Sequence, residues 1–193
     1  MSPKTFIALL RGINVSGRNK IPMRELCTLC AELGWENVQS YIQSGNLVFK
    51  ASAKAAKLET ELEQAIERRF GLSIPIIVRA AAVWPEYVRD NPYPDASQKE
   101  PNLVMLALSK AMPKKDAVEK LQERAVSGER IVQVGDALWV HYSGGVAKSK
   151  LSPALFDRLV GSPVTTRNWR TVLKLQEMAG HSDRNTESAG SSA

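Results

Sequence analysis

NVQSYIQSGNLVFK (residues 37–50) has the pattern of a β-hairpin, in which two strand-forming runs flank the turn signal Ser44-Gly45-Asn46. Glycine and asparagine tolerate the positive φ that such a tight turn requires. A strand and a helix are expected before this hairpin, and a helix and a strand after it, at residues 5–10, 22–33, 54–70 and 73–79. The order β-α-β-β-α-β is the split ferredoxin-like pattern.

RIVQVGDALWVHY (residues 130–142) predicts a second hairpin, and its surroundings repeat the order of the first half. Pro22 and Pro113 are each expected to open a helix. Pro22 and Gly45 are 23 residues apart, and Pro113 and Gly135 are 22 apart. Such a repeated spacing indicates one architecture used twice. We therefore expect an α+β protein of two tandem ferredoxin-like (βαββαβ) halves with a C-terminal helix.

The predicted organisation has four parts. They are a first βαββαβ half at residues 1–79, a helix and proline-rich connector at 80–101, a second βαββα(β) half with the C-terminal helix at 102–179, and a tail at 180–193. The tail is rich in small and polar residues, so we expect it to be disordered.

The predicted first strands of the two halves are apolar on both sides. TFIALL (5–10) and NLVMLAL (102–108) carry apolar residues at odd and even positions, so both faces of each sheet are expected to be buried. An RNA-recognition motif keeps one sheet face open and carries stacking aromatic residues there. No stretch matches that aromatic signature, which argues against this mode of RNA binding.

The positive charge of the chain is segregated. Lys and Arg total 26 against 20 Asp and Glu, giving a formal net charge of +6 at pH 7. Residues 1–24, 137–156 and 158–176 contain basic but no acidic side chains. Such segments favour anionic partners, although a solvated basic surface is the simpler alternative.

RGINVSGRNK (11–20) is the most basic of the predicted loops and resembles a phosphate-binding Walker A loop in its glycine spacing. Gly12 and Gly17 have the required separation, but Arg18 and Asn19 replace the lysine and the hydroxyl residue. Nucleotide hydrolysis of that type is therefore excluded. A loop between a strand and a helix N-terminus can still bind an anion, while a simple basic turn is the alternative.

Two further basic segments precede predicted helices. In TTRNWRT (165–171), Asn168 is a predicted helix N-cap, and Trp169 offers a stacking face or a core side chain. KSKLSP (148–153) adds two lysines before another helix. Because glycines restrain the backbone little, GGVAKSK (144–150) is also compatible with a mobile flap.

The sequence predicts no metal site or cofactor. Cys27 and Cys30 lie inside an apolar helix pattern, where core thiols are expected, and no second cysteine pair exists to complete a zinc site. His141 and His181 have no obvious ligand near them in sequence. With no apolar run of membrane length and no signal peptide, a soluble cytoplasmic protein is expected.

Five stretches together resemble a bacterial family known as domain of unknown function 1697: RGINVSGRNK (11–20), SYIQSGNLVF (40–49), DNPYP (90–94), KSKL (148–151) and TTRNWRTVLKL (165–175). The resemblance spans residues 4–179 and implies a bacterial protein of a family without an established activity. It also implies that the following residues occupy family-motif positions: Arg11, Gly12, Asn14, Ser44, Gly45, Asn46, Thr166, Arg167, Asn168 and Trp169.

The leading hypothesis is a binding site for an anionic, phosphate-bearing ligand, either nucleic acid or a nucleotide. The ligand-binding residues that we expect are Arg11, Asn14, Lys20, Lys150, Arg167, Asn168 and Trp169, with Ser44 and Asn46 as additional candidates. The Gly45 turn is expected at the end of the sheet where the first strand starts, away from Arg11. The alternatives are a phosphate-handling transferase or hydrolase, and a protein–protein interaction module.

Overall fold

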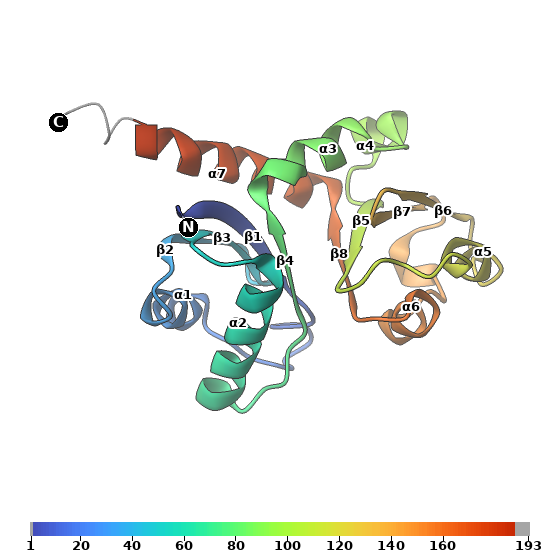
Figure 1. The fold of residues 1–193 in the computed structure, drawn as a ribbon. Helices are drawn as coiled ribbons and strands as arrows, with labels where there is room; N and C mark the ends of the chain where they lie inside the picture. The colour runs from blue at the N-terminus through green and yellow to red at the C-terminus, as the bar shows by residue number, and fades with distance from the viewer. Residues whose placement is uncertain (1, 188–193) are drawn as a thin grey trace. The chain divides into compact units, whose positions relative to one another are not determined.

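The computed structural model describes residues 2–187, and the chain divides into two compact units. The first unit comprises the chain up to Pro85 together with the segment from Lys174 on, and the second comprises Glu86–Leu173. Each unit contains one four-stranded antiparallel sheet with helices (Figure 1). The two similar halves that the sequence predicts are therefore present, in a mixed α and β protein.

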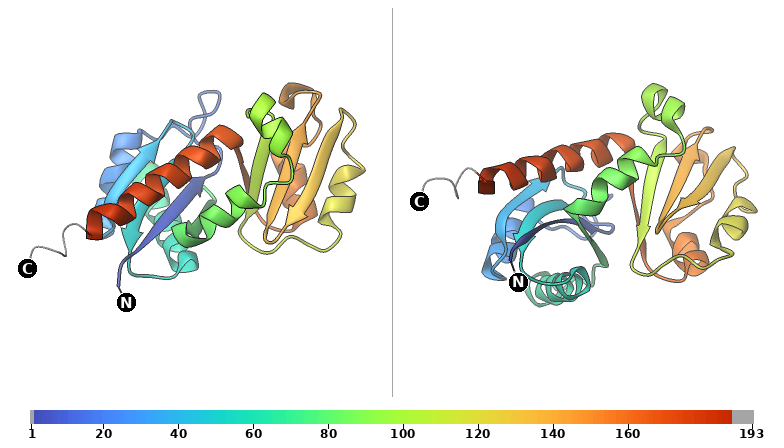
Figure 2. Two further views of the ribbon diagram at one scale, coloured as in Figure 1. Left: turned by 90° about the horizontal axis from the view of Figure 1, so that it is seen from above. Right: turned by 45° about the horizontal axis from the view of Figure 1, so that its top comes forward.

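The first unit has a sheet of strand order β2-β3-β1-β4, with β1 antiparallel to both of its neighbours. Helices α1 and α2 lie on one face of this sheet, and the part of α7 from Lys174 on lies on the other (Figures 1 and 2). Its elements are β1 (Lys4–Leu10), α1 (Met23–Glu32), β2 (Glu36–Tyr41), β3 (Asn46–Ala51), α2 (Ala55–Phe70), β4 (Ile76–Ala80) and η1 (Ala81–Val83).

The second unit has the corresponding strand order β6-β7-β5-β8. Its elements are α4 (Pro94–Lys99), β5 (Val104–Ser109), α5 (Ala117–Gln122), β6 (Glu129–Val134), β7 (Ala137–Tyr142), η2 (Val146–Lys148), α6 (Pro153–Val160) and β8 (Val164–Asn168). Helices α3 (Trp84–Arg89) and α7 (Trp169–Glu187) each contribute residues to both units.

Both faces of each sheet are buried, as the strand sequences predict. In β1, Phe6 and Ala8 belong to the core cluster that includes side chains of α1 and α2, while Ile7 between them is equally inaccessible. In β7, Val140 packs in the core of the second unit, and on the other face the ring of His141 lies 5.6 Å from that of Tyr93.

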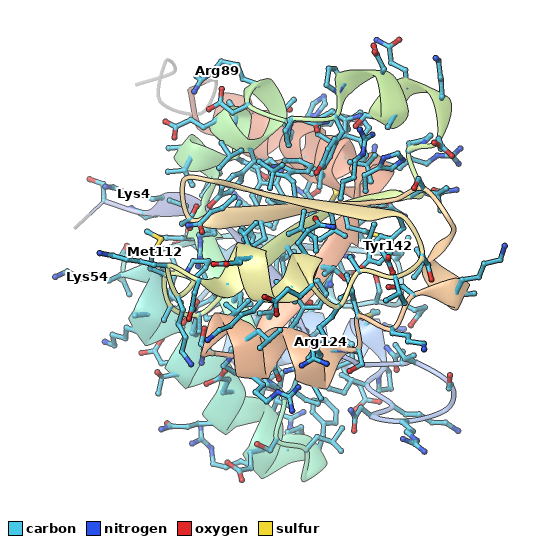
Figure 3. The ribbon with its side chains drawn as sticks, turned by 90° about the vertical axis from the view of Figure 1, so that its right-hand side faces the viewer. Lys4, Lys54, Arg89, Met112, Arg124 and Tyr142 are labelled. Atoms are coloured by element: carbon cyan, nitrogen blue, oxygen red, sulfur yellow. The ribbon has the colours of Figure 1, made fainter. Side chains whose placement is uncertain are left out.

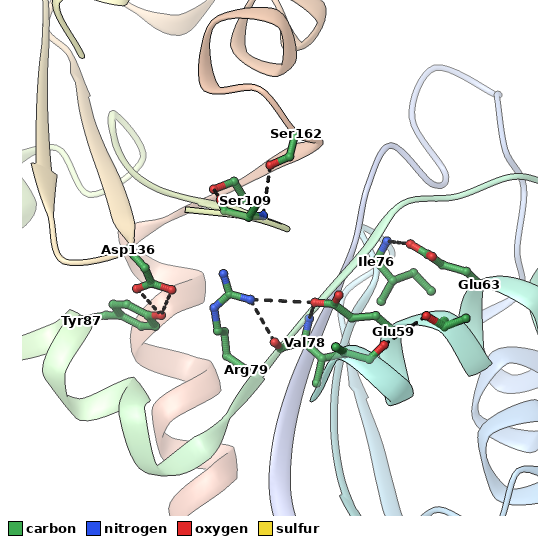
Figure 4. Close-up of polar contacts among 12 residues, drawn as sticks. Glu59, Glu63, Ile76, Val78, Arg79, Tyr87, Ser109, Asp136 and Ser162 are labelled. Atoms are coloured by element: carbon green, nitrogen blue, oxygen red, sulfur yellow. Dashed lines mark hydrogen bonds and ion pairs between the residues drawn. The ribbon is translucent and has the colours of Figure 1, made fainter. Parts of the chain in front are cut away.

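Helix side chains bond the edge strands β4 and β8. The Glu63 carboxylate of α2 accepts the Ile76 N–H at 2.8 Å (Figure 4), and Asp157 of α6 accepts the Val164 N–H at 2.9 Å. Ile76 and Val164 are the first residues of β4 and β8, so the same bond closes the same edge in both units. Glu59 makes a second bond of this kind to β4 (Figure 4). Covered edges do not pair with foreign strands.

Helix α7 corrects the predicted start of the tail. We expected disorder from Gly180, but the helix continues to Glu187. Ser182 is buried, and its hydroxyl accepts a hydrogen bond from Gln39 of β2 at 3.5 Å, so contact with the sheet holds this polar stretch. Residues 188–193 of the predicted tail lie outside the described residues.

Helix α5 begins later than the sequence predicts. Pro113 was expected to open it, but the helix starts at Ala117. The Lys114 N–H instead donates to the carbonyl of Val160 at 3.2 Å, which ties residues before α5 to the end of α6. This tertiary bond has no signal in the local sequence.

Candidate functional site: the basic loop and its neighbours

The loop between β1 and α1, residues 11–21 (the basic loop), is a small hairpin. The Arg18 N–H donates to the Val15 carbonyl at 2.9 Å, and the Asn14 N–H donates to the Asn19 carbonyl at 3.1 Å. The two residues at the tip have φ of 49° and 77°, a pair of left-handed conformations typical of a type I′ turn. The basic side chains of this loop therefore stand on a hydrogen-bonded backbone.

The Asn14 side chain holds the basic loop in place. Its Nδ2 donates to the carbonyls of Ile21 and Gln43, and its Oδ1 accepts the Ile21 N–H, each at 2.9 Å. Both Nδ2 hydrogens are used in these bonds. The sequence predicted that Asn14 orients a ligand, whereas the structure gives its amide a role in joining the loop to the β2–β3 turn.

The β2–β3 turn lies beside the end of β1, contrary to our expectation that it lies away from Arg11. The Leu10 N–H donates to the Gly45 carbonyl at 2.8 Å, and Leu9 is the register partner of Asn46. The expectation is wrong because β3 runs antiparallel to β1, so β3 begins where β1 ends. The basic loop and this turn consequently form one end of the first unit.

Ser44 and Asn46, the additional candidates, stabilise this turn. Asn46 is fully buried, and its Nδ2 donates to the Tyr41 carbonyl at 2.9 Å and to the Ser44 hydroxyl at 3.2 Å. The turn also contains Ile42, whose side chain is 50% exposed and whose φ is 50°. A left-handed conformation is strained for a β-branched residue.

The cations of the basic loop differ in exposure. Lys20 and Arg18 are exposed and Arg11 is half-buried. Arg18 was not among the predicted ligand-binding residues. It was considered only as the residue that replaces the lysine of a Walker A loop. Its place beside the hairpin tip adds it to the candidate site.

In the second unit, Lys150 follows a segment that is tethered instead of mobile. The Ser127 hydroxyl donates to the Lys148 carbonyl at 3.0 Å, and the Ser149 hydroxyl donates to the buried carboxylate of Glu129. A Cβ at Gly144 would lie 2.1 Å from the Ser127 carbonyl oxygen, so the glycine is needed for close packing there. The idea of a mobile flap is not supported, and Lys150 is exposed at its end.

The pKa of Glu129 results from opposing effects. Burial alone would raise the pKa of this carboxyl, but hydrogen bonds from the Ser149 hydroxyl and from the backbone N–H groups of Glu129 and Ser127 bring it below its ordinary value. The carboxylate is therefore charged at neutral pH and joins the Ser149 hydroxyl to the backbone at Ser127 and Glu129.

Arg167 is a buried cation of β8. It is 8% exposed, and its Nη1 donates to the Thr165 hydroxyl and the Thr166 carbonyl, both at 2.8 Å. Burial lowers the pKa of Arg167 to about 10, so the guanidinium remains charged at neutral pH. Both of these hydrogen bonds lie within its own strand.

Asn168 and Trp169 start helix α7. The Asn168 Oδ1 accepts the Thr171 N–H at 3.0 Å, which confirms the predicted N-cap. The half-buried Trp169 ring lies 5.8 Å from the ring of Trp139, which is fully buried. This contact joins Trp169 to the core of the second unit, in line with the alternative of a core side chain.

The structure thus gathers the predicted residues into one group in each unit. Arg11, Asn14, Lys20, Ser44 and Asn46 share one end of the first unit. The remaining ones are at one end of the second sheet, because β7 and β8 both run antiparallel to β5 and end on the same side. Within residues 2–187, no three His, Cys, Asp or Glu side chains are grouped to hold a metal ion, and no helix is long and apolar enough to cross a membrane.

Comparison with known proteins identifies a family without a known activity. The family model described as "Protein of unknown function (DUF1697)" matches residues 4–139. The chain is similar in fold to the conserved bacterial protein SP0830 from Streptococcus pneumoniae, with a TM-score of 0.70 and 22% sequence identity, over 92% of this chain and 99% of that one. No curated protein matches the sequence.

Proposed function

The chain belongs to the DUF1697 family, whose function is unknown, and from that premise we propose that it binds the phosphate backbone of a nucleic acid through the basic loop. The observation that carries this proposal is an acid-free set of cations on a hydrogen-bonded hairpin. Arg11, Arg18 and Lys20 fall within ten residues, and the first acidic residue of the chain is Glu25. Phosphate neutralisation by such side chains releases counterions and supplies most of the affinity for nucleic acid.

The shape of the loop favours a polymer over a small metabolite. Sites for small ligands are concave and enclose most of the ligand. Arg18 and Lys20 are instead exposed on a loop that projects beyond the strand ends of its own unit (Figure 2). Exposed cations on a projecting hairpin suit an extended phosphate backbone, and the protein has no aromatic RNA-binding signature that would read bases.

The other predicted residues receive different roles in this proposal. Lys150 is exposed and contributes a phosphate contact on the second unit. Arg167, Asn168 and Trp169 are assigned to the structure of that unit, because their described bonds and ring contact serve β8 and α7. A cytoplasmic location, where nucleic acid is abundant, belongs to the same proposal.

We also assign each unit to the ferredoxin-like pattern. In each sheet the first strand lies between the third and the fourth, in the orders β3-β1-β4 and β7-β5-β8, and the second strand occupies the edge. The helices follow the first and third strands in both units. These orders support the assignment.

The test is the salt dependence of binding, measured by fluorescence anisotropy with labelled single-stranded and duplex oligonucleotides. We expect the double variant R18Q/K20Q to bind about ten- to a hundredfold more weakly at about 0.1 M salt. The slope of log affinity against log salt should fall by about 1.4 to 1.8, because each phosphate contact contributes about 0.7 to 0.9.

A matched control removes the same charge at the opposite end of the first unit. Lys4 begins β1 and Lys54 precedes α2, and both side chains extend away from the ribbon (Figure 3). K4Q/K54Q should keep the wild-type slope. Equal behaviour of the two double variants would refute the site, and absence of binding by the wild-type protein at low salt would refute the function.

A further inference from the structure

The second unit contains a loop in the same structural position as the basic loop. Residues 110–115, KAMPKK, follow β5 as the basic loop follows β1. The Arg11 N–H donates to the carbonyl of Pro75 at 3.0 Å, and the Lys110 N–H donates to the carbonyl of Pro163 at 3.2 Å. Each proline directly precedes the last strand of its sheet, so the two bonds are equivalent.

This loop is also basic. Lys114 and Lys115 are exposed and Lys110 is half-buried, which repeats the exposure of Arg18, Lys20 and Arg11. The nearest acidic residue along the chain is Asp116, whose carboxylate lies 2.6 Å from Lys120 Nζ, one turn further along the helix. That pairing offsets the charge of Asp116 and leaves the loop with a positive potential.

The backbone of this loop is fixed to the segment after α6. The Ala111 N–H donates to the Ser162 hydroxyl at 3.1 Å (Figure 4), and the Lys114 N–H donates to the Val160 carbonyl. Gly161, at φ of 97°, lies under the aliphatic stem of Lys114, because a Cβ there would approach the lysine Cε to 2.6 Å. The stem of Lys114 therefore packs against the backbone at Gly161, although the residue as a whole is exposed.

Each of the two loops also presents one aliphatic side chain to solvent. Val15 of the basic loop is 54% exposed, and Met112 is 65% exposed (Figure 3). Proteins that bind the minor groove of DNA use cationic side chains and frequently insert an apolar side chain, such as methionine, between base steps. Both loops therefore combine cations with one exposed aliphatic side chain at equivalent positions. This likeness supports the same class of ligand for both loops.

We propose that residues 110–115 form a second phosphate-backbone contact, so that each unit binds nucleic acid with the loop after its first strand. This inference rests on the proposed function of the basic loop. It extends that function to residues that the sequence motifs do not include, since KAMPKK shares no pattern with RGINVSGRNK except its charge.

The test uses the full-length protein and the same labelled oligonucleotides. K114Q/K115Q removes two charges and keeps the Cβ and Cγ methylene groups of both side chains. K99Q/R124Q, the control, removes the same charge from exposed positions on α4 and after α5. We expect K114Q/K115Q to weaken binding about ten- to a hundredfold and to lower the salt slope by about 1.4 to 1.8, with little effect of the control.

The outcomes separate this inference from the function on which it rests. If R18Q/K20Q weakens binding while K114Q/K115Q matches K99Q/R124Q, the second contact is wrong and the basic loop stands. If the wild-type protein binds no oligonucleotide, the proposed function itself is wrong. The thermal unfolding temperature of each variant is measured as a control. A value equal to that of the wild type shows that the lower affinity comes from the removed charge and not from loss of the fold.

Discussion

Asparagine side chains at the family-motif positions act as local hydrogen-bonding groups of the backbone. Asn14 bonds Ile21 and Gln43, Asn46 bonds Tyr41, and Asn168 caps α7. Short amide side chains can replace backbone partners and also tolerate left-handed φ, as Asn14 does at 54°. These asparagine residues therefore shape the loops, and the proposed ligand contacts fall to the charged side chains between them.

Two tyrosines of the second unit allow a direct test of hydrogen bonding at equal burial. Tyr87 and Tyr93 are both 8% exposed, but the Tyr87 hydroxyl donates to Asp136 at 2.9 Å, whereas that of Tyr93 has no partner among residues 2–187. Tyr93→Phe should leave the free energy of unfolding unchanged or raise it by up to about 1 kcal/mol. Tyr87→Phe should lower it by about 1 to 3 kcal/mol. Urea denaturation of both variants checks this, and a larger loss for Tyr93→Phe would contradict the structure.

At the scale of elements, the β2–β3 turn depends on one glycine. Gly45 has φ of 81°, and a Cβ there would lie 2.8 Å from both Leu10 Cβ and Ile13 Cδ1. Gly45→Ala should therefore lower the free energy of unfolding by about 2 to 4 kcal/mol through combined backbone strain and overpacking.

The matched control for Gly45 is Gly71, which has φ of 67° but no atom near the position of a Cβ. Gly71→Ala should lower the free energy of unfolding only through backbone strain, by about 1 to 2 kcal/mol. Denaturant unfolding of the two variants gives the comparison. Equal losses would show that the turn does not pack against the end of β1.

The tether of the 143–150 segment should be sensitive to pH through Glu129. Because its pKa is lowered in the folded protein, the carboxylate stabilises the fold at pH values above its ordinary pKa of 4.5. This contribution is lost as the pH falls through the lower folded value. Glu129→Gln should therefore be less stable than wild type by about 1 to 3 kcal/mol at about pH 7.

The same difference should shrink as the pH falls below 4.5 and through the lower folded pKa of Glu129, because the wild-type carboxyl then takes up a proton. Unfolding in urea across this range measures both proteins, and Glu119→Gln serves as a control because Glu119 is an exposed acidic residue of α5. A Glu129→Gln difference that stays constant with pH would contradict the tether.

Sequence patterns were informative for elements and weak for tertiary contacts. The hairpins, the helix at 55–70 and the two-faced burial of β1 follow from local periodicity, and they agree with the structure. The late start of α5 and the packing of Ser182 depend on residues far away in sequence. The position of the β2–β3 turn was deducible, since antiparallel pairing of β1 and β3 already places it beside Arg11.

The candidate site could be predicted only in part. Charge segregation identified the basic loop, but the roles of its residues could not be read from it. The folded backbone determines the hydrogen bonds of Asn14, the burial of Arg167 and the exposure of Arg18. Residues 110–115 match no sequence motif. Their equivalence to the basic loop follows from the Lys110–Pro163 hydrogen bond, which the sequence does not predict.

At the scale of the whole molecule, duplication explains both the fold and the proposed function. Each unit has the same strand order, a helix carboxylate that accepts the first N–H of its last strand, and a basic loop after its first strand. The net charge of +6 is modest, so a diffuse field would bind nucleic acid weakly. The proposed binding therefore requires direct contacts between the loop cations and individual phosphates.

The most direct measurement is an NMR titration of the 15N-labelled full-length protein with a short DNA duplex at about 0.05 M salt. The account predicts that backbone amide shifts concentrate in residues 11–21 and 42–46, with further shifts at 110–115 and at Lys150, and that R18Q/K20Q removes the first group. Shifts spread over exposed lysines throughout the chain, or concentrated at Lys4 and Lys54, would contradict it.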